Sequence, residues 1–398
     1  MTQYRPNPMK GFSIALGSKQ FYLDPLLMSG VMALLLLGFV ILTSASLNVG
    51  EKLPSGNPFH YPVRQSVHIL IGVVMGAVSA SIPLHVYEKI GPWLFIMGVA
   101  LLVLVLIVGV KVNGSMRWLS VAGVRIQVSE AAKLFAVIYM AGYLTRHVET
   151  VRESWSGMMR PLFLLSFACL LILLEPDFGS AAVILMTAML MMFLGGARLR
   201  QFAVLTVILA GVGALLIWYS PYRLVRVTSF MDPWQDPMGS GFQLTQAEIA
   251  FGRGEWFGVG LGSSLQKLSY LPEAHTDFIF SVLAEELGLV GTMSVILLFA
   301  VVIWRIFVVA RNAEWASQPF GAFLGYGLGL WIGLQAFINM GVNMGMLPTK
   351  GLTLPLVSYG GGSMVITCIG LGMLFRVHHE AMVAGIELPQ EKPKWVSV

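Results

Sequence analysis

Residues 25–47 read PLLMSGVMALLLLGFVILTSASL, and no side chain in this stretch carries a charge. About 20 such residues suffice to cross the hydrocarbon core of a bilayer as an α-helix. The stretch follows a polar leader and is too long for the apolar core of a signal peptide. We therefore expect an uncleaved first transmembrane helix here.

Nine further apolar runs follow along the chain. The sequence is 56% hydrophobic and 11% charged, whereas soluble globular proteins have about 25% charged residues. A soluble enzyme is excluded, and the 23 Phe, 10 Trp and 11 Tyr residues exclude a disordered chain. The runs cover residues 65–84, 92–110, 127–144, 159–174, 179–197, 202–219, 278–304, 320–345 and 352–377. The predicted fold class is all-α, a polytopic integral membrane protein with about ten transmembrane helices.

The positions of Lys and Arg predict the orientation. An even number of spans places both ends of the chain on one side, and more than half of the 25 basic residues fall in the tails and loops of that side. Basic residues are enriched in cytoplasmic loops. We therefore expect cytoplasmic tails at 1–24 and 378–398 and a membrane domain at 25–377, in the cytoplasmic (inner) membrane.

The loop at 220–276, between the seventh and eighth spans, stands out by its length. Connections in compact proteins usually have only about 4–6 residues. This one carries aromatic side chains such as Trp234, Trp256 and Phe257, which gives it enough apolar surface to pack on a membrane. In the predicted orientation it is a large, folded periplasmic loop.

Glu130 and Lys133 lie three residues apart at the start of the fourth span. A charged residue at the centre of a transmembrane helix costs about 2.5–3.5 kcal/mol on insertion scales. One interpretation is an ion pair within the helix, since i and i+3 share a face. The other is that Lys133 also faces a cavity and orients a neighbouring carboxylate. Both interpretations stay open at this point.

The eighth span is preceded by Pro272-Glu273-Ala-His275-Thr276-Asp277. Asp277 is expected at the mouth of the membrane, where an acidic side chain also suits the N-cap of a helix. A cap needs only one polar residue, however, and here Glu273, His275 and Asp277 are crowded beside the long loop. The crowding favours a functional site.

Two other segments are predicted to be structural. Glu175-Pro176-Asp177 is typical of a tight helical hairpin with an N-cap. Residues 345–363 are so rich in Pro and Gly that we expect a broken helix or re-entrant segment, buried in protein or lining a wet cavity. The glycines at 258, 260 and 262 lack the context of a phosphate-binding loop, and nothing indicates nucleic-acid binding.

Six motifs, in order along almost the whole chain, together resemble the SEDS family (shape, elongation, division, sporulation), and their wording is most like its division branch. They are Asn113-Gly114-Ser-Met-Arg117-Trp118, Ser129-Glu130-Ala-Ala-Lys133, Glu175-Pro176-Asp177-Phe178-Gly179, Arg226-Val-Thr-Ser-Phe230-Met-Asp232-Pro233, Gln266 to Phe278 and Pro348 to Gly361.

The resemblance implies a peptidoglycan glycosyltransferase that joins lipid II units into glycan strands at the outer face of the cytoplasmic membrane, for septal wall synthesis in cell division. It implies that Asp277 is the essential acidic residue, with Glu130 and Lys133 in the same cavity. Joining two sugars requires a base near the acceptor 4-hydroxyl and stabilisation of a departing lipid pyrophosphate. Asp277 is the expected general base.

Lys133, Arg117, Arg226 and Lys267 would hold the pyrophosphate, together with a divalent cation, Mg²⁺ or Mn²⁺, which gives a role to basic residues outside the predicted cytoplasmic loops. The metal ligands are not defined, with Asp277 and Glu273 as the candidates. The expected substrate-binding residues are Arg117, Arg226, Lys267, Glu273 and His275, with Arg253 and Lys350 as further candidates.

The expected partners are lipid II, membrane lipids, a class B penicillin-binding protein that acts as transpeptidase, and other division proteins. Two alternatives remain, a lipid II flippase and a division scaffold without catalysis. The charged residues gather toward the outer side rather than at mid-depth, which favours catalysis there. A scaffold alone would not explain Glu130 and Lys133 within a span.

Overall fold

The computed structural model describes residues 12–16, 19–112, 115–121, 124–268, 270–349 and 351–387. Asn113, Gly114 and Lys350, named above, lie outside these residues.

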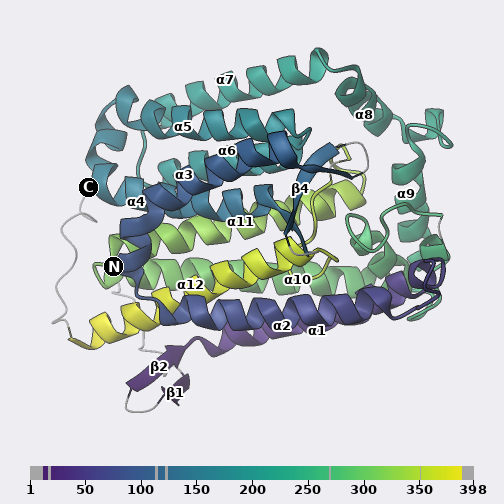
Figure 1. The fold of residues 1–398 in the computed structure, drawn as a ribbon, viewed down its shortest axis with the longest axis horizontal. Helices are drawn as coiled ribbons and strands as arrows, with labels where there is room; N and C mark the ends of the chain where they lie inside the picture. Colours follow the sequence, from purple (N-terminus) through teal and green to yellow (C-terminus); the bar gives the residue numbers. More distant parts are fainter. Residues whose placement is uncertain are drawn as a thin grey trace.

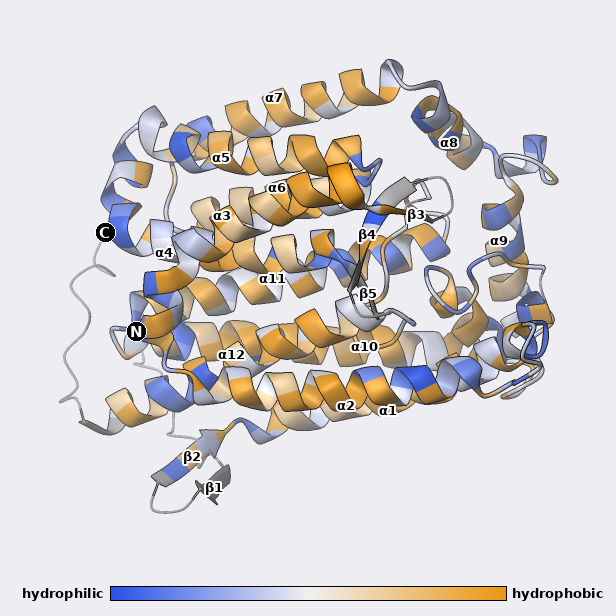
Figure 2. Cartoon of the chain, viewed as in Figure 1, coloured by the Kyte–Doolittle hydropathy of each residue, from blue (hydrophilic) through white to orange (hydrophobic). Residues whose placement is uncertain are grey.

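Within the described residues, ten long helices run side by side (Figure 1), one for each of the ten predicted spans, although several begin or end at other residues than predicted. Eight of these described helices are long and apolar enough to cross a membrane, and α6 is a shorter apolar helix of 17 residues. Figure 2 shows the apolar residues along the helices. The helices are α1 (Pro25–Glu51), α2 (His60–Ser81), α3 (Leu84–Val108), α4 (Val128–Glu153), α5 (Trp155–Leu174), α6 (Phe178–Leu194), α7 (Leu199–Trp218), α10 (Ile279–Trp315), α11 (Pro319–Asn343) and α12 (Gly361–Glu387).

The helix α4 is the most polar of the ten described, and it lies in the middle of the bundle. It packs against α3, α5, α6 and α11, and nearly every residue from Val128 to Leu144 is buried. A helix enclosed by protein on all sides does not meet lipid, so it can carry charged side chains that a lipid-facing helix cannot. This position explains how Glu130 and Lys133 are accommodated.

The loop at 220–276 is folded, as its composition predicts. It contains two helices, α8 (Pro221–Met231) and α9 (Phe242–Gly254), and two short 3-10 turns, η1 (Pro233–Gln235) and η2 (Gln266–Leu268). We call the end of the bundle where these elements lie the loop end; it is on the right in Figure 1. The helix α8, described in full, has no buried residue, whereas α9 packs against α10.

The helix α10 is longer than the predicted span and is broken at Gly288, whose φ of +66° interrupts the helical path. The loop replaces main-chain hydrogen bonds at the break. The Val259 amide donates to the Glu285 carbonyl at 3.0 Å, and the Leu289 amide donates to the Glu255 carbonyl at 2.8 Å. The loop is therefore attached to the first part of α10, the helix that Asp277 directly precedes.

The predicted all-α fold class is confirmed, and two small antiparallel sheets that were not predicted accompany the helices. Strands β1 (Phe12–Leu16) and β2 (Lys19–Leu23) form one, and β3 (Val110–Val112), β4 (Ser115–Val121) and β5 (Val124–Gln127) form the other. The third span was expected to reach residue 110, but α3 ends at Val108. The residues that follow are rich in β-branched Val and Ile, which favour strands. The second sheet lies at the loop end (Figure 1).

The segment between α11 and α12 confirms the expectation of irregular buried backbone. The last span was expected to begin at residue 352, but α12 begins at Gly361. Before it, Leu354, Leu356 and Val357 are buried in a non-helical stretch that contains Pro355. Such backbone is tolerated at membrane depth only inside protein.

The start and end of the described chain meet at the end of the bundle opposite the loop end. The Tyr22 amide donates to His379 Nδ1 at 3.2 Å. Beside this contact, the buried Asp24 and Arg305 form an ion pair at 2.6 Å. This arrangement agrees with an even number of spans.

Candidate active site

Asp277 lies in the turn directly before α10, and two asparagines of α11 hold its main chain. The side-chain amides of Asn339 and Asn343 each donate to the Asp277 carbonyl at 2.9 Å. The Asn343 side-chain oxygen also accepts from the Ser281 amide at 3.1 Å, within the first turn of α10. Phe278 occupies the N-cap without a side-chain bond, so the interpretation of Asp277 as a helix cap is wrong. Its carboxylate is left available for chemistry.

The Pro- and Gly-rich segment closes over this carboxylate. A methyl group on Gly351 would lie 3.1 Å from Asp277 Oδ2, so the main chain of residue 351 lies against the acid. The Asn339 side chain ties the same segment to α11 by donating to the Leu352 carbonyl at 2.6 Å. Asp277 is thus held between α10, α11 and the segment that precedes α12.

Burial raises the pKa of the Asp277 carboxyl to about 7, with the negative charge of Glu273 as the next cause. The Asp177 carboxylate acts in the same direction, whereas Arg117 and Arg226 lower the pKa. A general base works best when its pKa lies near the operating pH. Asp277 therefore combines partial exposure with the proton affinity that the predicted base requires.

Arg117 and Arg226 approach from two different elements. Arg117 of β4 donates from Nε to the Glu175 carbonyl at 2.9 Å and from an Nη to the Pro176 carbonyl at 2.6 Å. Arg226 of α8 donates to the Thr349 carbonyl at 3.5 Å. A guanidinium has five N–H donors, so each keeps donors for an anion. Both arginines and Glu273 lie near enough to Asp277 for their charges to change its pKa.

Glu130 and Lys133 form the expected ion pair, 2.8 Å long and almost completely buried. Lys133 Nζ also donates to Gln335 of α11 at 2.6 Å. In the described part of the chain, no hydrogen bond or ion pair joins Lys133 to Asp277. The connection is indirect, because Gln335 and Asn339 lie four residues apart on α11 and hold the two groups.

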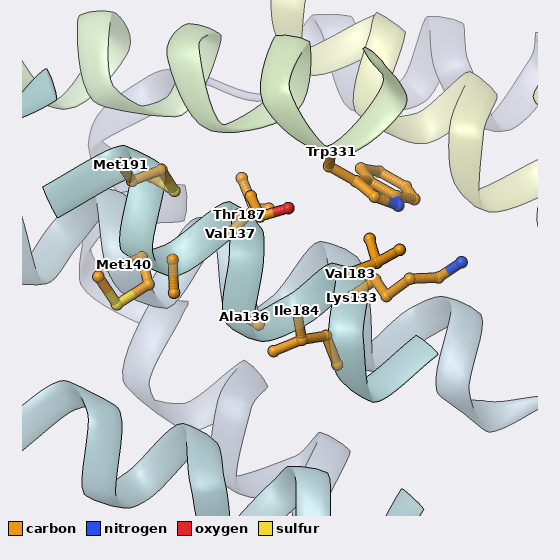
Figure 3. Close-up of a pocket in the computed structure, with 10 residues that line it drawn as sticks. Lys133, Ala136, Val137, Met140, Val183, Ile184, Thr187, Met191 and Trp331 are labelled. Atoms are coloured by element: carbon orange, nitrogen blue, oxygen red, sulfur yellow. The ribbon is translucent and has the colours of Figure 1, made fainter. Parts of the chain in front are cut away.

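A pocket between α4, α6 and α11 runs along the Lys133 side chain. Figure 3 shows that the aliphatic stem of Lys133 lines the pocket beside Val183 and Trp331, while its amino group points away. The remaining walls are almost entirely apolar, with Met140 and Met191 at the far end. The pocket is therefore a packing feature behind the ion pair rather than a second polar site.

Lys267 and Arg253 are placed elsewhere. Lys267 is buried, 2.8 Å from Glu286 of α10, and Arg253 lies 2.7 Å from Glu285. These pairs fasten the loop to α10. This placement corrects the expectation that Lys267 is available to a pyrophosphate, so we leave Lys267 and Arg253 out of the proposed site.

His275 belongs to a group of rings beside Asp277. Its ring centroid lies 4.7 Å from that of Tyr61 and 5.8 Å from that of Tyr359. Burial lowers the pKa of the His275 imidazole below its usual value, and Glu273 acts against this. His275 is therefore mostly neutral at pH 7.

Asn339, Asn343 and Gln335 are the site residues that sequence analysis missed. They occur at i, i+4 and i+8 in an otherwise apolar span, so they share one helical face. Polar side chains on one face of a transmembrane helix point to the bundle interior or a cavity. That periodicity is the signal by which they can be found.

The turn between α5 and α6 contains Asp177, which caps a helix, and Glu175, whose carboxyl group is buried. Asp177 is the N-cap of α6, as predicted, and accepts from the Ser180 amide at 3.1 Å. Glu175 is 0% exposed, and neither of its carboxyl oxygens has a hydrogen-bond partner among the described residues. Burial, together with the charge of Asp177, raises the pKa of Glu175 to about 8, against the opposing effect of Arg117. Glu175 is therefore mostly protonated at pH 7.

Glu175→Gln is expected to remove a pH dependence of stability. With a pKa of about 8 when folded and an ordinary value of 4.5, ionisation of Glu175 disfavours the folded state increasingly as the pH rises between these values. The effect is at most about 5 kcal/mol. Thermal unfolding in detergent should show the variant gaining stability over wild type from pH 5 to pH 8. The exposed Glu51→Gln is the control, and a gain independent of pH would contradict the assignment.

The described residues contain no group of three or more His, Cys, Asp or Glu side chains arranged to hold a metal ion. Mg²⁺ is commonly bound by one or two carboxylates together with substrate phosphates. Asp277 and Glu273 fit this second mode, in which the substrate supplies most of the ligands.

Comparison with known proteins shows the family of this chain. Residues 25–382 match the FtsW, RodA and SpoVE family, described as "Cell cycle protein". The chain is 57% identical to a protein of Methylococcus capsulatus over 94% of both chains, and 56% identical to one of Methylomonas methanica over 91% of this chain and 93% of the other. Both carry the name "Probable peptidoglycan glycosyltransferase FtsW".

Solved structures show the same fold. One belongs to work described as "Structural coordination of polymerization and crosslinking by a peptidoglycan synthase complex", with a TM-score of 0.73, 30% identity and coverage of 90% of this chain and 98% of the other. The rod shape determining protein RodA of Thermus thermophilus gives a TM-score of 0.66 at 28% identity, covering 90% and 97%. The chain belongs to the FtsW, RodA and SpoVE family of cell cycle proteins.

Proposed function

We propose that this protein is a peptidoglycan glycosyltransferase that polymerises lipid II into glycan strands. The observation that carries the proposal is the Asp277 carboxylate, whose pKa of about 7 and two neighbouring arginines suit proton transfer beside a phosphate. The names of the family relatives support the reaction class. The loop end would face the outer side of the cytoplasmic membrane at the division septum, with both termini in the cytoplasm.

In the proposed reaction, ionised Asp277 accepts the proton of the acceptor 4-hydroxyl. The acceptor oxygen bonds to the anomeric carbon of the donor sugar, and the bond from that carbon to the phosphate oxygen breaks. Its electron pair leaves with the lipid pyrophosphate. Arg117 and Arg226 would donate hydrogen bonds to that pyrophosphate and stabilise the charge that develops on it.

A divalent cation, Mg²⁺ or Mn²⁺, would be held by Asp277 or Glu273 together with the pyrophosphate oxygens, and it would neutralise part of the leaving-group charge. Lys133 and Glu130 would act behind this group, through Gln335 and Asn339, by fixing α4 against α11. The charged residues of the site gather at the loop end rather than at mid-depth, which disfavours the flippase alternative.

Polymerisation in detergent is the expected result that separates an enzyme from a flippase. A polymerase needs only substrate, cation and protein, because its reactants meet at one membrane face. Purified protein, with its partner if required, should convert lipid II into glycan ladders on denaturing gels, and EDTA should reduce the product. The enzyme assignment fails if no ladder forms under any partner or metal condition while proteoliposomes translocate labelled lipid II in an Asp277-dependent way.

A class B penicillin-binding protein is the proposed partner, which would cross-link the emerging strand. An exposed apolar stripe on α10, formed by Leu289, Met293 and Leu297, lies next to the folded loop and suits a transmembrane helix of that partner. The two native cysteines, Cys169 and Cys368, are buried, so an introduced surface cysteine would react selectively.

Cysteine at Leu289, Met293 or Leu297 is therefore expected to cross-link to the partner in membranes. Leu199→Cys is the matched control, because Leu199 is 70% exposed but lies at the opposite end of α7 from the loop end. Cross-links through Leu199→Cys alone would place the partner elsewhere. Equal yields at all four positions would indicate random collision.

A further inference from the structure

Four rings from three chain segments meet beside Asp277, and we call them the ring cluster: Tyr61 and His68 of α2, His275, and Tyr359. Centroid separations are 4.7 Å for Tyr61 and His275, 5.2 Å for Tyr61 and Tyr359, and 5.9 Å for His68 and Tyr359. The rings meet at tilted and edge-on angles. None of these rings has a part in the proton transfer proposed above.

The ring cluster is fixed in position relative to the reacting group. The Tyr359 amide donates to the His275 carbonyl at 3.0 Å. This main-chain hydrogen bond holds the rings of Tyr359 and His275 near each other. His275 is two residues from Asp277, a reach of about 7 Å. Tyr359 belongs to the segment that contains Gly351, where an added methyl group would lie 3.1 Å from the Asp277 carboxylate. A ligand on the rings would therefore lie within about one sugar unit of the proposed base.

The ring cluster is accessible and amphipathic. Tyr61, His275 and Tyr359 are each partly exposed, and Arg64, which is exposed, interacts with the Tyr359 hydroxyl. Tyrosine offers a flat apolar face and a polar tip. Pyranose rings have the complementary chemistry, because their C–H faces stack on aromatic rings while their hydroxyl and acetamido groups form hydrogen bonds at the edge.

Unpaired polar atoms argue that the ring cluster is more than a packing seam. Gln65 lies between Tyr61 and His68 on one face of α2 and is 1% exposed. Its Nε2 donates to the Ser358 carbonyl at 3.4 Å, but its Oε1 has no partner among the described residues, and neither has His68 Nδ1. Buried polar atoms in folded proteins normally have a hydrogen-bond partner. These two leave bonding capacity for a ligand or for water.

We propose that the ring cluster is a binding subsite for a β-linked N-acetylhexosamine ring of the glycan, adjacent to the sugar that reacts at Asp277. Tyr61 and Tyr359 would stack on the sugar, and Arg64 and Gln65 would bind its polar groups. The inference rests on the proposed glycosyltransferase function and adds a glycan-positioning role for residues outside the reacting group.

Tyr61→Leu is expected to raise KM for lipid II about threefold to tenfold with little change in kcat, since an aromatic stacking pair contributes about 0.5–1.5 kcal/mol. Tyr61→Phe keeps the ring and should stay within about twofold of wild type. The matched control is Tyr219→Leu, which should leave KM unchanged. Tyr219 is exposed and directly precedes the loop at 220–276, which contains His275. A membrane-anchoring role would affect both tyrosines alike, and that outcome would overturn the subsite.

Direct binding gives a second readout that does not depend on polymerisation. Saturation-transfer NMR with a tetramer of β-1,4-linked N-acetylglucosamine should show contact with wild type and with Asp277→Asn, and reduced contact with Tyr61→Leu. Equal signals for wild type and Tyr61→Leu would overturn the subsite even if wild type polymerises. If the NMR signal is lost only in Tyr61→Leu while wild type does not polymerise lipid II, the subsite is supported and the proposed reaction is wrong. If Tyr61→Leu does not fold, the exposed Arg64→Gln tests the same contact.

Discussion

Asp277→Asn is expected to abolish polymerisation while the protein still folds and inserts. Asparagine keeps the size of the side chain and an acceptor oxygen but cannot take up the acceptor proton. The bonds from Asn339 and Asn343 reach the main-chain carbonyl of residue 277, so the substitution leaves them in place. General base catalysis contributes about 10²–10⁴-fold, and the residual rate should be correspondingly low.

The measurement is the rate of glycan formation from lipid II by the purified variant, with thermal unfolding as the check on folding. Asp236→Asn is the control, since Asp236 is an exposed loop residue that bonds locally to Ser240. Wild-type activity should rise as the pH passes about 7, because ionised Asp277 is the active form. Arg226→Gln removes a charge that lowers this pKa and should move the rise to higher pH. A product yield near wild type from Asp277→Asn would refute the base role.

The helical bundle was predictable because each transmembrane helix is formed by a continuous run of apolar residues. Ten apolar runs gave ten helices, and the Glu130–Lys133 pair and the Asp177 cap followed from spacing within a single helix. These features depend on local periodicity and on the length needed to cross a bilayer. Local pattern also identified the buried irregular segment before α12.

Features that depend on contacts between distant segments were not predictable. Lys267 looks like a free cation in the sequence, but the fold places Glu286 beside it. The break at Gly288 depends on loop bonds from residues about 30 positions away. Asn343, rather than Asp277, supplies a side-chain acceptor to the first turn of α10. In each case a partner brought by tertiary structure decides the role of a residue whose own neighbours in the sequence are uninformative.

Lys133→Met is the second substitution with a large expected effect. We expect it to lower both stability and polymerisation activity, for two separable reasons. Removing the ammonium leaves Glu130 buried without its partner, and breaking a buried pair by removing one member costs about 3–5 kcal/mol. The same substitution removes the 2.6 Å hydrogen bond from Lys133 to Gln335. Loss of activity in the single variant therefore combines instability with disturbance of the α11 face that positions Asp277.

The double variant Lys133→Met with Glu130→Gln distinguishes the two causes, because it removes both charges and leaves no unpaired carboxylate. We expect the unfolding temperature of the double variant to recover toward wild type while its polymerisation activity stays low, because the bond from Lys133 to Gln335 is still missing. Glu130→Gln alone keeps the bond from Lys133 to Gln335 and should have the smaller effect. If the double variant regained both stability and activity, Lys133 would be needed only to neutralise Glu130, and its proposed action on the Asp277 site through α11 would be wrong.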